Sequence, residues 1–328
     1  MPEIQIDVAR CNGCGLCVDF CPVDVFDLVT PNGTYRKTAR ATNVDRCWAC
    51  DTCVGQCPTG AIQVIESLQE TITGNGHDEP VAEPIPLEEK HRYARWHRTL
   101  MDVLRLRWNP VAITLIRNGG PLPDVPMPRV KLRHCQSIMA ARRGKSLLMP
   151  VQCHACPDGT HILGLTEIPP KLASGELYIH FKKLASIEAA RQMIKERPRL
   201  PERSNRATLI TPLKDAVLTP DVITIIAQPE QMMWLCMASS FYTGKRFTFK
   251  VSGFNAQCVE TTLLPYTSGE FNISLGCYGC RASSDISDDL MFMGVPVAKM
   301  GDLIKGLIAL GKKAVPDSRN KVYLPPNL

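Results

Sequence analysis

The sequence predicts an α+β protein made of a small cysteine-dense domain and a larger domain of mixed α/β character. Eight of the 15 cysteines fall within the first 57 residues, and the other seven are scattered from Cys135 to Cys280. Beyond about residue 91, short apolar runs typical of strands alternate with runs of helical periodicity. The chain has 328 residues, of which 45% are hydrophobic, so it is long enough for two domains. We predict a small domain over 1–68, a linker over 69–90 and the larger domain over 91–328.

Individual elements follow from these patterns. Strand-like runs frame the small domain and recur in the larger one, at 4–8, 61–65, 111–116, 207–210 and 221–226. Helical periodicity marks the segments 132–143, 187–196, 230–242 and 302–312. The segment 69–90 is rich in proline, glycine and acidic residues, as linkers often are. The topology of the larger domain does not follow from these patterns.

Charge and targeting signals limit the environment of the chain. Residues 1–68 hold five Lys/Arg and eight Asp/Glu, a net charge of −3, which leaves 33 basic and 24 acidic residues, a net of +9, for the rest. The acidic part could dock on the basic part electrostatically, or both charges could simply maintain solubility. The sequence lacks a secretory signal and the long apolar run of a membrane span, so we expect a cytoplasmic protein. Reducing conditions there favour metal-ligating or reactive thiols over disulfides.

Two copies of one cysteine motif dominate the small domain. Cys11, Cys14, Cys17 and Cys21 are followed by Pro22, and Cys47, Cys50, Cys53 and Cys57 are followed by Pro58. This is the spacing by which bacterial ferredoxins bind two [4Fe–4S] clusters, with the fourth cysteine of each motif serving the other cluster. The predicted ligand sets are therefore Cys11, Cys14, Cys17 and Cys57 for one cluster, and Cys47, Cys50, Cys53 and Cys21 for the other. Zinc sites usually pair two CxxC turns and do not repeat this pattern.

The small domain thus resembles two-cluster bacterial ferredoxins over residues 1 to about 66. It departs from them in a longer connection over 22–46, which contains Asn32-Gly33 and a basic run. We expect a turn in a surface insertion there, and a docking loop for a redox partner is the alternative. Trp48 is similar to a tryptophan in the cluster loop of the ferredoxin-like subunit of adenylylsulfate reductases. It could shield a cluster or lie on an electron exit path, or it could only pack against its loop.

The larger domain carries a second set of cysteines. Two CxxC pairs, Cys153–Cys156 and Cys277–Cys280, are accompanied by the single residues Cys135, Cys236 and Cys258. Two such pairs that met in the fold could hold a third [4Fe–4S] cluster or a zinc ion, since both sulfurs of a pair can reach one centre. They could equally be a redox-active thiol pair or buried apolar residues. Cys236 lies in a strongly apolar helical segment and is predicted to be core.

From about Trp108 to Leu310 the sequence resembles the DUF169 family of cysteine-rich archaeal and bacterial proteins. The segments that carry the resemblance are Pro110–Ile113, His134–Gln136, Pro229–Trp234, Ser274–Arg281 and Asp285–Asp289. The resemblance brings no established chemistry, but it implies that the cysteines are a family feature. It therefore favours a shared site built from Cys135, Cys156, Cys258, Cys277 and Cys280, with Cys153 as a less secure sixth candidate.

Other residues give weaker signals. His134, His154 and His161 are near the cysteines in sequence and could be ligands or proton donors, although surface positions are the simpler interpretation. The basic stretch 195–206 is predicted to be solvated surface. Aromatic residues do not interleave with it, so nucleic-acid binding is not expected. The sequence also lacks a phosphate-binding loop and a dinucleotide fingerprint.

These observations predict an iron–sulfur electron-transfer protein. It would relay single electrons through two [4Fe–4S] clusters to the second domain or to a partner, as a subunit or partner of a larger anaerobic redox enzyme. The alternative is a self-contained reductase, an iron–sulfur oxidoreductase whose active site is a third cluster or reactive thiol pair in the second domain. That alternative requires a substrate-sized pocket lined by the later cysteines. The substrate, the partner, the direction of electron flow and the oligomeric state stay open.

Overall fold

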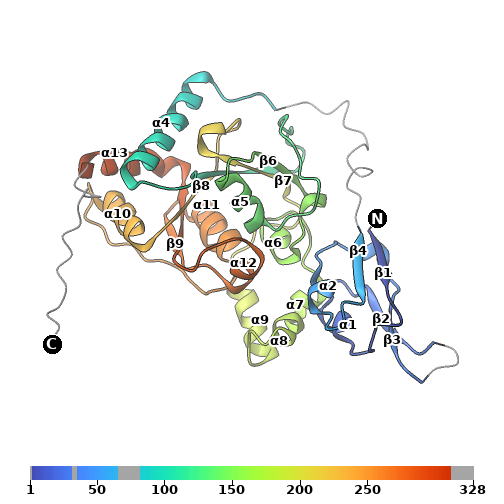
Figure 1. The fold of residues 1–328 in the computed structure, drawn as a ribbon. Coiled ribbons are helices and arrows are strands. Elements are labelled where there is room, and N and C mark those ends of the chain that lie inside the picture. Colours follow the sequence, from blue (N-terminus) through green and yellow to red (C-terminus); the bar gives the residue numbers. More distant parts are fainter. Residues whose placement is uncertain (1, 32–34, 66–81, 312–328) are drawn as a thin grey trace, which may run out of the picture.

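The chain folds into a small N-terminal domain and a larger domain beside it (Figure 1). The computed structural model describes residues 2–31, 35–65 and 82–311. Most of the predicted linker, residues 69–81, lies outside the described residues. Helix α4 (Leu87–Leu104) begins within the last part of the predicted linker range, where the sequence pattern gave no sign of a helix. The predicted α+β class is confirmed.

The first and last strands of the N-terminal domain pair with each other. Strand β1 (Glu3–Ile6) pairs antiparallel with β4 (Ile62–Ile65), so the predicted terminal strands are present and lie side by side. Strand β1 ends earlier than predicted because the carboxylate of Asp7 accepts hydrogen bonds from the backbone N–H groups of Ala9 and Arg10, which turns the chain. Two short helices, α1 (Leu16–Phe20) and α2 (Thr52–Gln56), follow the two cysteine loops.

The long connection between the cysteine motifs forms a hairpin. Strand β2 (Phe26–Val29) pairs antiparallel with β3 (Thr38–Ala41), and a short 3₁₀ turn (Val44–Arg46) leads to the second motif. The predicted turn at Asn32-Gly33 falls in 32–34, outside the described residues. The described part of the predicted insertion is therefore a β-hairpin.

The larger domain is organised around one six-stranded sheet with the strand order β6-β7-β5-β8-β10-β9. All pairings in it are antiparallel. The strands are β5 (Val111–Arg117), β6 (Leu147–Pro150), β7 (Asn205–Pro212), β8 (Val222–Ala227), β9 (Asn272–Ser274) and β10 (Met291–Pro296). The three strands that the sequence predicted, β5, β7 and β8, lie inside the sheet, where long apolar runs are buried on both faces.

Helices cover both faces of this sheet, and successive residues of a strand point to opposite sides. Ala112 and Ile223 pack with α4, α10 (Pro229–Ser240) and α13 (Val297–Leu310) on one face. Val111 and Ile226 pack on the other face with α5 (His134–Arg142) and with residues of the cysteine-bearing segments. The later cysteines are therefore gathered, with the exception of Cys236, away from the α4–α10–α13 layer.

The remaining elements are short. They are 3₁₀ turns at Val151–Cys153 and Leu213–Asp215, α6 (Pro157–Ile162), α7 (Pro170–Ser174), α8 (Glu176–His180), α9 (Ile187–Glu196), a π-helix (Ala256–Leu263), α11 (Leu264–Ser268) and α12 (Tyr278–Ser283). Helices α7, α8 and α9 form an arm that reaches the N-terminal domain (Figure 1). The four predicted helices correspond to α5, α9, α10 and α13, with α9 matching its predicted bounds. Among the described helices, none has the length and apolar character needed to cross a membrane.

Candidate functional site

Each cysteine motif of the N-terminal domain surrounds a small hollow. One hollow is lined by Cys11, Cys14, Cys17 and Cys57, together with the backbone of the first loop. The other is lined by Cys47, Cys50, Cys53 and Cys21. The structure thus brings the eight cysteines together in the two sets predicted from the spacing, each completed by the fourth cysteine of the other motif.

The two loops share their backbone conformation as well as their spacing. Gly13 and Ala49 occupy equivalent positions and both have positive φ angles, 71° and 48°. Gly15 and Asp51 are a second equivalent pair, at 79° and 55°. A non-glycine residue in this left-handed region costs about 1–2 kcal/mol. Strain of this kind, at two non-glycine residues of the second loop, is typical of loops that bind a ligand.

Backbone N–H groups point at cysteine sulfurs in both sets. The N–H of Ala39 donates to Cys11 Sγ at 3.4 Å, and the N–H of Val25 donates to Cys21 Sγ at 3.3 Å. Burial, together with the neighbouring thiolates of Cys11 and Cys14, raises the pKa of Cys17 to about 11. Four thiols in this setting favour a bound cation that would compensate their negative charge as they ionise. The donor set therefore fits an iron–sulfur cluster in each hollow.

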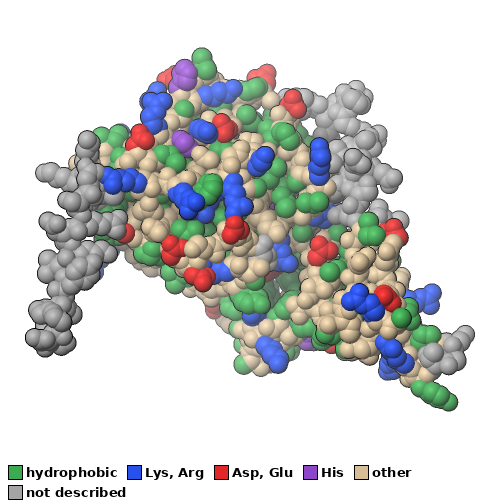
Figure 2. Space-filling view, viewed as in Figure 1, with side chains coloured by type: hydrophobic (Ala, Val, Ile, Leu, Met, Phe, Trp, Pro, Cys, Tyr) green, Lys and Arg blue, Asp and Glu red, His purple; other side chains and the backbone are tan. Residues whose placement is uncertain are grey.

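Polar side chains of the larger domain contact backbone carbonyls of the N-terminal domain. Lys171 Nζ donates to the carbonyl of Val18 at 2.5 Å and pairs with Asp24 at 2.8 Å. His180 Nδ1 lies 2.8 Å from the carbonyl oxygen of Asp19. Both side chains contact the segment of α1 that follows Cys17. On the face drawn in Figure 2, basic and acidic side chains intermingle over the larger domain.

Apolar contacts and a second lysine complete this interface. The ring of Phe20 packs against the rings of His180 and Phe181, with centroids 5.9 and 4.7 Å apart. Near the second cysteine loop, Lys131 Nζ donates to the carbonyl of Trp48 at 3.0 Å. The described contacts of Trp48 thus join its loop to the larger domain.

Five cysteines of the larger domain lie at the starts of four helices. Cys135 is the second residue of α5, Cys156 precedes α6 as its N-cap, and Cys258 is the third residue of the π-helix. Cys277 is the N-cap of α12 and Cys280 is its third residue. Cys135, Cys277 and Cys280 border one apolar cluster, and the helix starts that carry Cys156 and Cys258 are joined by the hydrogen bond from Asn255 to Asp158. We call these five residues the five-cysteine group; they are the cysteines that the family resemblance favours, and their role as one shared site stays a prediction.

The thiols of this group differ in their pKa values. Burial raises the pKa of Cys156 to about 12 and also raises that of Cys258, to which the thiolates of Cys156, Cys277 and Cys135 add. A hydrogen bond from the Cys280 thiol lowers the pKa of Cys277 to about 6, with help from the N–H groups of Ala256 and Cys280. The pKa of Cys280 is raised in turn. Cys277 is therefore the thiol of this group that ionises most readily.

The remaining two cysteines occupy different surroundings. Cys153, the sixth candidate, is fully buried in the apolar cluster under α5 that also contains Met149 and Ile210. Cys236 packs against the core of the opposite face and is only partly buried. The prediction that Cys236 belongs to that core therefore holds only in part.

The three histidines near the cysteines are buried, so the expectation of surface positions is wrong. Burial lowers the pKa of His134 to about 3 and that of His154 to about 4. The Nε2 atom of His134 lies 3.2 Å from the hydroxyl of Thr262, and that of His154 lies 3.0 Å from the carbonyl oxygen of Met149. His161 is also fully buried. Burial also lowers the pKa of His161 to about 4, so all three are neutral at physiological pH. His134 and His154 suit packing and hydrogen bonding, whereas neither ring nitrogen of His161 has a hydrogen-bond partner among the described residues.

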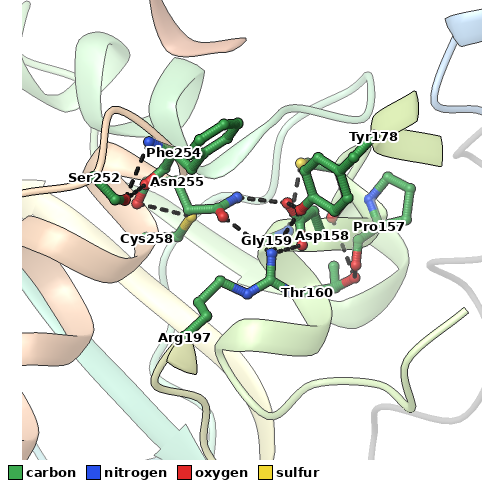
Figure 3. A network of polar contacts seen from close by, with 11 residues as sticks. Pro157, Asp158, Gly159, Thr160, Tyr178, Arg197, Ser252, Phe254, Asn255 and Cys258 are labelled. Atoms are coloured by element: carbon green, nitrogen blue, oxygen red, sulfur yellow. Dashed lines mark hydrogen bonds and ion pairs between the residues drawn. The ribbon is translucent and has the colours of Figure 1, made fainter. Parts of the chain in front are cut away.

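A buried ion pair lies beside the five-cysteine group (Figure 3). Arg197 Nη1 lies 2.6 Å from Asp158 Oδ1, and it donates to the hydroxyl of Tyr178 and to Asn255 Oδ1. Tyr178 and Asn255 both donate to Asp158 Oδ2, at 2.7 and 2.5 Å. The prediction that 195–206 is solvated surface is thus wrong at Arg197. Its sequence neighbours gave no sign of burial, because the acidic partner comes from a distant helix.

A cleft of about 620 Å³ lies between the domains. Val23 and Trp48 of the N-terminal domain line it, as do Lys131, His154 and Thr160 of the larger domain. None of the described residues that line it is a cysteine. The pocket required by the reductase alternative, one lined by the later cysteines, is therefore not the cleft found here.

Comparisons with known proteins match both parts of the chain. A 4Fe–4S dicluster domain matches residues 10–61, which contain the two cysteine loops. The DUF169 family, described as "Uncharacterised ArCR", matches residues 99–306. An uncharacterized protein of Methanocaldococcus jannaschii is 29% identical over 213 residues, which cover 64% of this chain and 91% of that protein. The N-terminal domain is therefore an iron–sulfur electron-transfer module of the ferredoxin type, and the chain belongs to the DUF169 family.

Proposed function

We propose that the protein is an electron relay in which the N-terminal domain delivers single electrons to the five-cysteine group of the larger domain. Cys11, Cys14, Cys17 and Cys57 would hold one cluster, and Cys47, Cys50, Cys53 and Cys21 the other. When bound, a [4Fe–4S] cluster takes up one electron and gives it up again. A low-potential one-electron donor protein would supply the electrons, and a larger redox enzyme of anaerobic metabolism would use them.

The segment 131–135 carries the proposal. It contacts the second cysteine loop at its first residue and contains Cys135 of the five-cysteine group at its last. At its start, Lys131 contacts the carbonyl of Trp48. Burial raises the pKa of Asp51 in the same loop, while the positive charges of Arg133 and Lys131 oppose that rise. Arg133 also lowers the pKa of Cys135 and of Cys156, against the effect of their burial. Arg133 therefore lies within electrostatic reach of both cysteine sites.

The exposure of the cysteines suggests a direction for the relay. Cys14 in the first loop is exposed, whereas the second loop is held against the larger domain through Trp48. An external donor would therefore approach the first loop, and electrons would leave through the second. A reducing compartment such as the cytoplasm would keep these cysteines available as ligands.

The test is an anaerobic reductive titration of the full chain with dithionite, read by absorbance and electron paramagnetic resonance. The variants Cys14→Ser and Cys50→Ser should each lose the signal of one N-terminal cluster, because each removes one ligand. Cys236→Ser, outside both sites, serves as the matched control and should retain every signal. A fully loaded chain with fewer than about eight irons, or one that dithionite cannot reduce reversibly, contradicts the relay.

A second candidate function is a reductase of a different design from the one the sequence suggests, in which the substrate would bind in the cleft beside Trp48 and not at the later cysteines. The volume of the cleft, about 620 Å³, is within the usual range for small-molecule sites. A reductase would consume dithionite over many turnovers when its small-molecule substrate is added. A relay would be reduced once by a few electrons per chain, and it would consume no further dithionite in the absence of its partner protein.

A further inference from the structure

We propose that Arg10, Arg36 and Lys37 form a docking surface for an acidic one-electron carrier protein, which would deliver its electron at the first cysteine loop. We call these three residues the basic surface. The inference deepens the proposed function and rests on it, because the surface matters only if electrons enter through the first loop. In the transfer, one electron leaves the carrier and one electron enters the chain, and no bond forms or breaks.

The β2–β3 hairpin brings two of the three cations to the first cysteine loop. A Cβ atom at Gly13 would overlap the carbonyl oxygen of Lys37 and would lie 3.5 Å from the Cβ of Lys37. Lys37 therefore lies against the residue that precedes Cys14. Its neighbour Arg36 donates from Nη2 to the carbonyl oxygen of Ala9 at 3.4 Å, just before the loop begins.

The hairpin is itself part of the first cysteine site. Leu28 of β2 and Ala39 of β3 line the first hollow. The N–H of Ala39 donates to Cys11 Sγ at 3.4 Å. A protein that binds the outer residues of the hairpin would therefore come close to the cysteines of the first set.

Arg10 lies beside the segment that supplies the fourth cysteine of this set. A Cβ atom at Gly60 would lie 3.1 Å from Nη2 of Arg10, so the guanidinium group lies against the turn that follows Cys57. Cys57 lines the first hollow together with the three cysteines of the first loop. The basic surface thus borders both chain segments that build the first set.

The basic surface is accessible, as a docking surface must be. All three of its cations are exposed, and so is Cys14. Large apolar side chains are exposed in the same segments, since Val8 is 53% exposed and Tyr35 is fully exposed. Figure 2 shows basic side chains gathered over the β2–β3 hairpin. Exposed charges around a few apolar contacts suit a transient complex between redox proteins.

The charges of the N-terminal domain are separated, and this separation selects an acidic partner. The basic surface holds three of the five Lys/Arg in this domain. Among the acidic residues, Asp24 pairs with Lys171 of the larger domain at 2.8 Å, and Asp7 accepts backbone N–H groups of its own turn. The whole chain has a net charge of +6, the same sign as the basic surface. Complementary charge would steer an acidic carrier to this surface and would disfavour a basic one.

The test is the dissociation constant of the complex between the anaerobically reconstituted full chain and a small ferredoxin with an acidic surface. Isothermal titration calorimetry measures it with both proteins oxidised. We expect binding to weaken as the salt concentration rises from about 50 to about 300 mM, because salt screens exposed charges. Lys37→Gln should raise the Kd about two- to fivefold, and replacement of all three cations by glutamine should raise it about tenfold.

Arg46→Gln is the matched control. It also removes one exposed positive charge from the N-terminal domain, but directly before the second cysteine loop, and it should leave the Kd unchanged. Cross-linking of the wild-type complex with a carbodiimide, which joins an amine to a carboxylate, does not depend on the folding of any variant. Lys37 is the one lysine among residues 1–68. Mass spectrometry should find it joined to a carboxylate of the ferredoxin.

Several results would overturn the basic surface. They are equal weakening by Lys37→Gln and Arg46→Gln, cross-links confined to lysines of the larger domain, a Kd that salt does not change, and no complex with the ferredoxin at low salt. Equally tight binding of cytochrome c, a basic carrier, would overturn it as well. Each of these results leaves the relay intact as long as dithionite reduces the chain reversibly. Failure of that reduction contradicts the relay itself, whatever the ferredoxin binds.

Discussion

The two cysteine sites are built in opposite ways. In the N-terminal domain, six of the eight cysteines lie in two short loops, and each loop surrounds most of one hollow. In the larger domain, the five-cysteine group draws on α5, α6, the π-helix and α12, which are far apart in sequence. The first site is therefore determined by local backbone conformation, whereas the second depends on the packing of a whole domain. Damage to the larger domain should abolish the second site and leave the first intact.

The largest effect is expected for Arg197→Met. The side chain of Arg197 is 5% exposed and that of Asp158 is 16% exposed, so the substitution leaves a buried carboxylate without its partner. Breaking such a pair costs about 3–5 kcal/mol of unfolding free energy. Urea unfolding of the larger domain, followed by circular dichroism, measures the loss. Arg203→Met is the matched control, because Arg203 pairs with Glu167 on the surface and should contribute little.

The iron content of Arg197→Met sharpens the comparison. About eight irons should remain, because the N-terminal loops do not depend on this ion pair. A loss of iron from the N-terminal domain would mean that the two sites are not independent.

Gly294→Ala should have the next largest effect. A Cβ atom at Gly294 in β10 would overlap the carbonyl oxygen of Thr261 and would push the π-helix away from the sheet. Overpacking of this kind costs about 1–3 kcal/mol. Gly301→Ala in α13 is the control, because a Cβ there meets no atom and alanine favours helix. Equal melting temperatures for the two variants would disprove the close packing of the π-helix.

Acid should destabilise the larger domain more than the small one. His134 and His154 keep pKa values of about 3 and about 4 in the folded chain because they are buried. The unfolded chain binds these protons near pH 6.5, so unfolding becomes more favourable as the pH falls from about 6.5 toward 4. At pH 5.5 each of the two histidines should lower the free energy of unfolding by about 1 kcal/mol relative to pH 7.5. Residues 1–68 contain no histidine.

Urea midpoints at the two pH values test this prediction. Replacement of the exposed His91 by glutamine should leave the pH dependence as it is. A midpoint that does not change between pH 7.5 and 5.5 would contradict the neutral, buried state of both histidines.

The smallest effect is expected for Ala49→Gly. The φ angle of Ala49, 48°, costs alanine about 1 kcal/mol, and glycine would avoid that cost. Glycine also increases the conformational entropy of the unfolded chain, which lowers the free energy of unfolding by a similar amount. The net change should be within about 0.5 kcal/mol, and iron content should be unchanged. Loss of the second cluster in this variant would show that the loop needs more than its backbone conformation.

The contrast between the sites also explains what could be predicted from the sequence. The N-terminal cysteines repeat at fixed spacing, so their arrangement in two sets could be predicted from the motif. The cysteine-bearing helices of the larger domain meet only through tertiary packing, and no spacing in the sequence indicates that Asn255 contacts Asp158. The resemblance to DUF169 proteins supplied the five cysteines, but not the buried histidines or Arg197. Strands β6 and β9 were missed because they are short and carry too few residues for a clear period.

The π-helix has a consequence for how this chain tolerates insertions and deletions. Its turns are wider than those of an α-helix, because each hydrogen bond spans five residues and not four. Removal of a single residue between Ala256 and Leu263 would allow an ordinary α-helix to form. Every side chain on one side of the deletion would then rotate by about 100° relative to the other side. Cys258 and the buried Glu260 could no longer both face their present partners, so a one-residue deletion here should be more damaging than most substitutions.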